Sequence, residues 1–180
     1  MNQNPTLAPA AAIAAAAAML DQTRAFLEKL TPAQYTTPCA AMFHGTIGQH
    51  VRHALDHFTA ALAALDGATI DYDHRARETP IERDPAAAVR TIDALLRTLR
   101  SISAPAADQP VCIRVMLTGD GDECELNSTL AREFAFAAHH AIHHNAMMVT
   151  IAQSMGIQPP KGFGKAPSTI DHERRAAAHA

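Results

Sequence analysis

Apolar side chains recur at steps of three and four residues in four stretches of the chain, with polar side chains between them. This spacing places the apolar side chains on one face of an α-helix. The first stretch is rich in alanine and ends where "LTP" brings in a proline, because proline cannot continue a helix. The pattern therefore predicts four helices, covering about residues 8–30, 46–66, 85–104 and 130–155.

Residues that favour helix ends stand at the borders of these stretches. Thr46 and Gln49 have the spacing of a capping box, in which each side chain bonds the backbone amide of the other residue. Asp84 followed by Pro85 gives the third helix an N-cap and a proline at its first position. Gly67 suits the end of the second helix, because glycine readily adopts the left-handed conformation found there.

The segments between the predicted helices carry weaker patterns. Residues 31–45 and 68–84 have no sustained period, so we expect a loop and an ordered crossover. Residues 111–117 and 123–127 alternate β-branched and polar side chains around a Gly/Asp turn, which predicts a β-hairpin. The segment from residue 157 onward is rich in Pro and Gly, and we expect it to lie over the helices before fraying. The expected fold class is all-α, with a long crossover between the second and third helices and a small β-hairpin between the third and fourth.

Length and composition restrict the class of protein. A chain of 180 residues matches one domain, residues 1–180. The net charge of −3 offers no basic surface for nucleic acid or an acidic membrane. The alanine-rich run at residues 8–20 lacks the basic residues that precede an export signal and is too short to span a bilayer. Three cysteines without CxxC spacing argue against a disulfide framework, and we expect a cytoplasmic location.

Two histidine clusters add candidate chemistry. "HHAIHHNAM" lies in the fourth predicted helix and "IGQHVRHALDH" in the second. His140 and His144 are one helical turn apart on the apolar face, whereas His139 and His143 fall on a neighbouring face. In the second helix the larger apolar residues form one face, and histidines and alanines share another. The histidines of that second face are His50, His53 and His57.

Three interpretations of these clusters remain open. A single histidine is usually a hydrogen-bonded side chain of the core or surface, and a cluster can also act as a general base without metal. A His-x-x-x-His pair on a helix, however, is a recurring metal chelate. Two such clusters on core-facing helices would leave several buried imidazoles without partners, which is costly. We therefore favour a divalent metal ion as their shared partner.

"TIGQHVRHALDHF", followed later in the chain by "HHAIHHNAM", resembles the DinB/YfiT-like superfamily of metal-binding four-helix-bundle proteins. The resemblance covers nearly the whole chain and implies that the four predicted helices form such a bundle. It also implies a metal site made by His53 of the second helix with His140 and His144 of the fourth. In this family His143 corresponds to a frequent extra histidine.

The ligand from the second helix stays open. A helical wheel places His50 and His57 at the centre of the histidine–alanine face and His53 toward its edge, so His50, His57 and His143 are alternative ligands. Three imidazoles leave a coordination position free. This donor set suits Zn or Ni first, with Fe, Co, Cu and Mn also compatible. Candidate acceptors for the ring protons that face away from the metal are Asp56, Gln49 and Glu133.

The resemblance implies metal-assisted thiol chemistry, either a thiol S-transferase that adds a low-molecular-weight thiol to an electrophile or a thiol-dependent isomerase. A free metal position also activates water, which makes a metal-dependent hydrolase one alternative. The other alternative is a non-catalytic, stress-associated bundle that binds a metal or ligand as a dimer. No residue is assigned a catalytic role, and none of Cys39, Cys112 and Cys124 is required.

The expected partners are a small-molecule substrate and a second copy of the chain, with no nucleic acid and no membrane. Arg52, Arg75 and Arg77 are candidates to hold a substrate carboxylate. A homodimer is expected because the alanine-rich first helix has little bulk to cover a core by itself. A cavity open above the histidines would favour an enzyme, whereas a site plugged by side chains would favour a structural role. The tail segment "PPKGFGKAPSTI" is the segment to inspect for such a plug.

Overall fold

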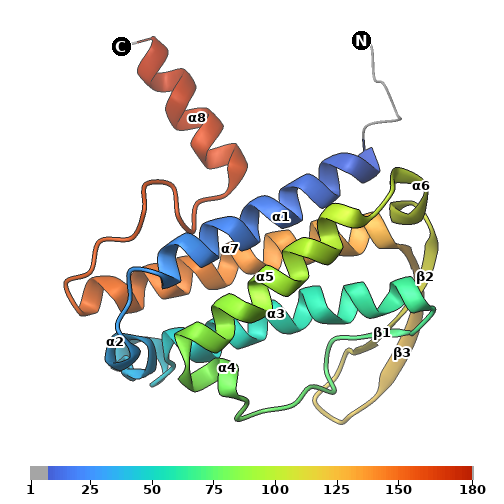
Figure 1. The fold of residues 1–180 in the computed structure, drawn as a ribbon, viewed down its shortest axis with the longest axis horizontal. Coiled ribbons are helices and arrows are strands. Elements are labelled where there is room, and N and C mark those ends of the chain that lie inside the picture. Colours follow the sequence, from blue (N-terminus) through green and yellow to red (C-terminus); the bar gives the residue numbers. More distant parts are fainter. Residues whose placement is uncertain (1–7, 180) are drawn as a thin grey trace.

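Helices make up most of the structure, a computed structural model that describes residues 8–179. Four long helices run through it, with a small three-stranded sheet beside them (Figure 1). Helix α1 packs against α5 and α7, and α3 packs against the same two helices. The long helices are α1 (Ala8–Leu27), α3 (Ile47–Ala63), α5 (Pro85–Ser101) and α7 (Leu130–Ser154).

The core between these helices is apolar. Each helix contributes side chains that are almost fully withdrawn from solvent, because its apolar face turns inward. Burial of one such large side chain contributes about 1.5–3 kcal/mol. Two examples from each helix, in chain order, are Leu20, Phe26, Leu55, Phe58, Ile92, Leu99, Phe134 and Met148. The four predicted helices are therefore confirmed.

The predicted starts of α3 and α5 are also confirmed. The Gln49 amide donates to Thr46 Oγ1 and the Thr46 amide donates to Gln49 Oε1, each over 3.1 Å. At the start of α5, Asp84 Oδ1 accepts the Ala86 amide at 2.9 Å. After its last α-helical residue, α3 continues as the 3₁₀ turn η3 (Ala64–Asp66). These caps satisfy amides that have no partner within their own helix.

The predicted β-hairpin is present and belongs to a larger sheet. Strands β2 (Pro110–Met116) and β3 (Glu123–Thr129) pair antiparallel. A strand from the crossover, β1 (Ile70–Asp71), pairs parallel with β2 and places Ile70 opposite Ile113. Both of these isoleucines are buried. The prediction of a hairpin alone was incomplete, because a two-residue strand is too short to show an alternating period.

The two segments predicted as loops contain short helices, and the first long helix ends at Leu27 instead of Leu30. Helices of three to five residues are shorter than the window in which a helical period is recognised, so the apolar pattern does not reveal them. In α2, Thr31 and Gln34 form a second capping box. The short helices are α2 (Pro32–Thr36), η2 (Ala40–Met42), α4 (Pro80–Arg83) and α6 (Ala104–Ala107).

The segment that follows α7 first packs on the core and then turns away. Phe163 is buried, and its ring centroid lies 4.6 Å from that of Phe26. A Cβ on Gly164 would lie 2.8 Å from the backbone of Ala146, so the close approach to α7 requires glycine. Helix α8 (Pro167–Ala178) then projects away from the other helices and buries no side chain (Figure 1).

The expectation that this tail frays is wrong for α8. Pro167 stands at its first turn, where proline is favoured. Asp171 pairs with Arg174 at 2.6 Å and with Arg175 at 2.8 Å, and such pairs one turn apart stabilise an exposed helix. The Pro/Gly-rich residues before α8 obscured this local pattern.

No helix among residues 8–179 combines the length and the apolar character needed to cross a membrane.

Candidate metal centre

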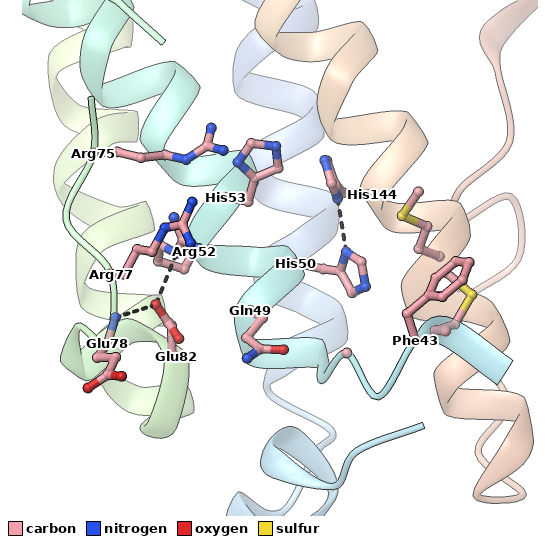
Figure 2. A pocket seen from close by; sticks show the side chains of 13 residues that line it. Phe43, Gln49, His50, Arg52, His53, Arg75, Arg77, Glu78, Glu82 and His144 are labelled. Carbon is pink, nitrogen blue, oxygen red and sulfur yellow. Dashed lines mark hydrogen bonds and ion pairs between the residues drawn. The ribbon is translucent and has the colours of Figure 1, made fainter. Parts of the chain in front are cut away.

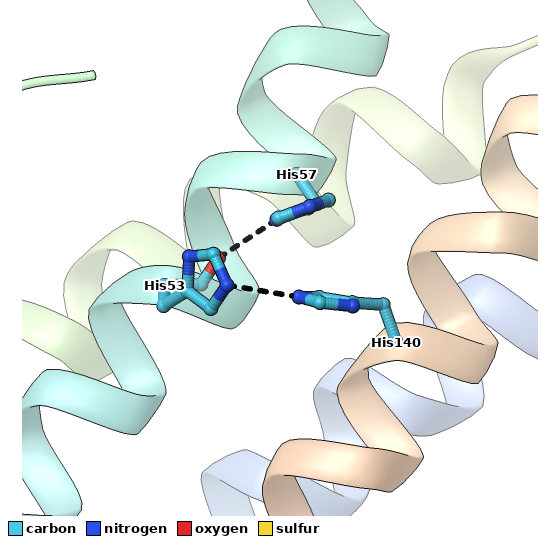
Figure 3. A group of neighbouring side chains, drawn as sticks. All are labelled: His53, His57 and His140. Atoms are coloured by element: carbon cyan, nitrogen blue, oxygen red, sulfur yellow. Dashed lines mark hydrogen bonds between the residues drawn. The ribbon is translucent and has the colours of Figure 1, made fainter. Parts of the chain in front are cut away.

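Five histidine side chains from α3 and α7 meet between these two helices. His57 and His144 are buried, and the other three are half-buried. Figure 3 shows His140 reaching from α7 toward two histidines of α3, and Figure 2 shows His144 reaching toward His50. The five are His50, His53 and His57 of α3 with His140 and His144 of α7.

Three Nε2 atoms of this cluster come close together. His140 Nε2 lies 3.1 Å from His53 Nε2 and 3.0 Å from His144 Nε2. One ring nitrogen carries either one hydrogen or one lone pair, so it cannot make an ordinary hydrogen bond to both neighbours. Two imidazoles bound tetrahedrally to one ion at about 2.0–2.1 Å would have nitrogens roughly 3.3 Å apart. The spacing therefore fits a shared divalent ion.

His57 offers a second combination with two of the same residues. Ring nitrogens of His53, His57 and His140 all lie within 4.8 Å of one another. His57 Nδ1 donates to the His53 carbonyl oxygen at 3.0 Å, which leaves its Nε2 with a lone pair. His53 and His140 belong to both combinations. The predicted set of His53, His140 and His144 stays a prediction, with His57 as the alternative nearest to it.

The remaining histidines are placed less favourably. His50 Nδ1 lies 3.0 Å from His144 Nδ1, on the opposite side of the His144 ring from its Nε2. His143 is exposed, with its ring centroid 5.4 Å from that of His144 and 6.4 Å from that of His140. His139 is also exposed. His50 is thus positioned to orient His144, while His143 and His139 lie at the surface.

The cluster is held neutral at pH 7. Burial lowers the pKa of His53 to about 2, with the nearby charge of Arg75 adding to the effect. Burial likewise lowers the pKa of His144 to about 3 and that of His140 to about 4, with neighbouring histidines adding to both. Neutral imidazoles present lone pairs, which metal ligation requires.

The candidate acceptors Gln49, Asp56 and Glu133 form no hydrogen bond with the histidine rings. Gln49 caps α3, and Asp56 pairs with Arg52 at 2.8 Å. Glu133 is fully buried on α7 but accepts the hydroxyl of Tyr72 at 2.7 Å. Each of these carboxylate or amide groups is instead bonded to another partner, so none of them orients a histidine ring in this way.

Tyr72 is a site residue that the sequence did not reveal. Its ring stacks on His57 with centroids 4.8 Å apart and planes 14° apart. It enters the site because β1 extends along β2 and carries the crossover past α3. The only signal was the alternation of Ile70 and Tyr72, which places both side chains on one face of a strand.

A cavity of about 570 Å³ opens beside the cluster (Figure 2). His50, His53 and His144 form part of its wall, and the rest comes from the loop around η2, the crossover, and further residues of α3, α4 and α7. None of residues 159–170 lines this cavity, so this segment does not plug it. Phe163 is instead buried against Phe26 of α1. The other lining residues are Met42, Phe43, Gly45, Gln49, Arg52, Arg75, Arg77, Glu78, Glu82 and Met147.

The crossover wall of the cavity is fixed by α4. A Cβ on Gly48 would lie 2.1 Å from the Glu82 carbonyl oxygen, so glycine allows α3 and α4 to touch. The Tyr35 hydroxyl donates to the Ile81 carbonyl at 2.6 Å, and Arg52 pairs with the Glu82 carboxylate at 3.1 Å. These three contacts hold the crossover where it faces the histidines.

Cys39, Cys112 and Cys124 are free, and none of them lines the cavity.

Comparison with known proteins gives one family and one relative. The sequence model of the DinB family matches residues 4–168. A curated protein named FK506-binding protein 5, from Rhizopus delemar, is 32% identical over 107 residues, which is 59% of this chain. The matched part is only 28% of that relative's length. No solved structure matches the chain.

Proposed function

We propose that this chain, which belongs to the DinB family, binds one divalent metal ion through His53, His140 and His144. The observation that carries the proposal is the approach of His140 Nε2 to two other Nε2 atoms, that of His53 at 3.1 Å and that of His144 at 3.0 Å. Zn or Ni suits this donor set best, and Fe, Co, Cu and Mn are compatible with it. We also propose that the four long helices form a four-helix bundle and that residues 1–180 make up one domain.

The proposed activity is metal-dependent thiol transfer, or isomerisation that depends on a thiol. When bound, a divalent ion supplies Lewis acidity and lowers the pKa of a thiol or water molecule at its free position. His50 would orient the His144 ring through its Nδ1 contact of 3.0 Å. His57 would orient the His140 ring, on which it stacks with centroids 3.9 Å apart, and is itself held by its Nδ1 bond to the His53 carbonyl. The cavity beside the cluster supports an exchangeable position that a small molecule can reach.

Two alternatives use the same residues. A hydrolase would place water where the transferase places a thiol. A non-catalytic protein that binds a metal or ligand under stress would bind the ion without turnover. The open cavity favours catalysis over a purely structural role. We also propose that the protein is cytoplasmic and forms a homodimer, which the many exposed alanines of α1 support.

Metal stoichiometry of purified histidine variants tests the site. We expect His140→Ala, His144→Ala and His53→Ala to lose tight metal binding, because each removes one of three nitrogens. His50→Ala and His57→Ala should weaken affinity about 10–100-fold, as expected for residues that orient a ligand. His139→Ala should retain the metal because its side chain is exposed at the surface.

Two results would change this proposal. An empty site in His57→Ala together with a full site in His53→Ala would make His57 the ligand. Full sites in both His140→Ala and His144→Ala would reject metal binding here.

An activity assay tests the proposed chemistry. Metal-loaded protein is mixed with a low-molecular-weight thiol and an electrophile, and formation of their adduct is measured. Adduct formation that is lost in His53→Ala separates thiol transfer from simple metal binding.

A further inference from the structure

The cavity beside the histidines has two unlike walls. Arg75 and Arg77 of the crossover lie on one side, and Figure 2 shows the Arg75 side chain extending toward His53. Phe43 of the η2 loop lies across the cavity from the arginines in the same view. Met42 and Met147 add apolar surface to the lining. A ligand that matches this lining needs both an anionic group and an apolar part.

Arg75 is a cation without a carboxylate partner. Its Nη1 donates to the Tyr72 carbonyl at 3.0 Å, while its Nε is buried with no partner among the described residues. No carboxylate of residues 8–179 lies within 4.0 Å of its guanidinium, whereas Arg52 is paired with both Asp56 and Glu82. Burial lowers the pKa of Arg75 and the positive charge of Arg52 adds to this effect, while the more distant carboxylates of Asp56 and Asp73 act in the opposite direction. A partly desolvated guanidinium that stays charged is most readily satisfied by an anion.

The carboxylates of the cavity are engaged elsewhere. Glu82 pairs with Arg52 at 3.1 Å and accepts the Glu78 amide at 2.8 Å. Glu78 is an exposed side chain whose carboxylate lies 3.6 Å from Arg83. Arg77 forms no ion pair with a described carboxylate. The charge available to a ligand on this wall is therefore positive.

Phe43, on the opposite wall, is unusual in both its exposure and its backbone conformation. Its side chain is 96% exposed. Its φ is 50° and that of His44 is 61°, and two successive non-glycine residues in the left-handed region are strained. Residues with strain of this kind are concentrated at active sites and ligand-binding sites. An aromatic ring held at a cavity rim offers a large apolar area to a ligand.

We infer that the cavity takes a small organic carboxylate, with its carboxylate on Arg75 and its apolar or aromatic body against Phe43. The cavity volume of about 570 Å³ is ample for such a molecule. This inference rests on the proposed function, since it makes the carboxylate one of the reactants brought to the metal. A planar guanidinium can bind a carboxylate through two parallel hydrogen bonds, which gives orientation as well as affinity.

Calorimetric titration with 3-phenylpropionate tests the inference on the full chain. Unmodified protein should bind this acid at least about tenfold more tightly than its amide, 3-phenylpropionamide, because a hydrogen bond to a charged group is the stronger kind. Arg75→Gln should lose that preference. Arg97→Gln, which removes an exposed arginine of α5 outside the cavity, should keep it. Phe43→Ala should weaken 3-phenylpropionate several-fold while leaving acetate unchanged.

The comparison of acid with amide needs no variant, so poor folding of Arg75→Gln cannot hide the answer. Equal affinities of unmodified protein for acid and amide would overturn the inference, as would full retention of the preference in folded Arg75→Gln. The titration is run on chelator-treated and metal-loaded samples whose metal content is measured. Binding that depends on Arg75 in protein that takes up no metal supports this inference and rejects the metal site. Binding that requires metal but is unchanged in Arg75→Gln supports the metal site and rejects this inference.

Discussion

At the scale of single residues, Tyr72 joins a buried carboxylate to the histidine cluster. Its hydroxyl donates to Glu133, which also accepts hydrogen bonds from Ser128 and Arg132. Burial raises the pKa of Tyr72, and the bond to Glu133 raises it further, so the hydroxyl stays protonated and keeps donating. The same ring stacks on His57. One side chain therefore satisfies Glu133 and fixes the position of a histidine.

We expect Tyr72→Phe to lower the free energy of unfolding by about 1–3 kcal/mol, because buried Glu133 loses a donor. The ring that stacks on His57 is retained, so metal content should stay close to that of the unmodified protein. Urea denaturation and elemental analysis measure the two quantities. Tyr35→Phe is a matched control that removes a bond to a neutral backbone carbonyl, and it should cost less. An equal or larger cost in Tyr35→Phe would contradict this account of Glu133.

The sequence predicted part of the site at this scale. His140 and His144 could be predicted because both stand on one helix, where their relation is fixed by the helical turn. Which histidine of α3 joins them could not be predicted, because the rotation of α3 about its axis depends on its packing against α5 and α7. His53 and His57 both turn toward His140. Tyr72 was missed because its position depends on the pairing of β1 with β2.

At the scale of elements, the contact between α3 and α4 determines the shape of the cavity. The helices meet at Gly48, where the Glu82 carbonyl would lie 2.1 Å from any Cβ. The crossover that carries Arg75 and Arg77 runs directly into α4. A displacement of α4 would therefore move the cationic wall of the cavity.

Gly48→Ala should destabilise the fold by about 1–3 kcal/mol, the usual cost of forcing extra volume into a packed contact. Guanidinium denaturation measures this change. Gly119→Ala is the control, because a Cβ at Gly119 meets no atom within 4 Å, and its effect should be close to zero. Similar free energies of unfolding for the two variants would show that α4 can move away from α3 without destabilising the fold.

The sequence predicted the long elements better than the short ones. The long helices were predicted because their apolar period repeats over several turns and their caps are local. Strand β1 and helices α2 and α4 were not, because two to five residues do not establish a period. Helix α8 was missed for another reason, since it buries no side chain and therefore has no apolar face to recognise.

At the scale of the whole molecule, the histidine cluster makes stability depend on pH. In the unfolded chain each imidazole binds a proton near pH 6.5. In the folded protein His53, His144 and His140 bind protons only near pH 2, 3 and 4. Between about pH 6.5 and 4 the unfolded chain therefore binds more protons, so stability is present above this window and is lost as the pH falls through it.

The melting temperature of chelator-treated protein should accordingly decrease between pH 7.5 and pH 5. Saturating metal should raise it at pH 7.5, because the ion binds only the folded state, and should raise it much less at pH 5, where protons compete for the imidazoles. Scanning calorimetry across this range provides the measurement. His139→Ala should follow the same curve as unmodified protein, whereas His53→Ala should show a weaker dependence. A melting temperature that is constant from pH 7.5 to pH 5 in chelator would contradict the neutral state of the cluster.

The packing of α1 on α7 has a consequence for synthesis on the ribosome. Thr23 of α1 donates to Asn145 of α7 across 122 positions of sequence, at 3.3 Å. Translation at about 5–20 residues per second separates the two helices by roughly 6–24 s. During that interval Leu20 and Phe26, which are buried in the folded protein, have no α7 to cover them. The nascent chain therefore carries an uncovered apolar helix until its last long helix emerges, and this is the period in which chaperones would bind it.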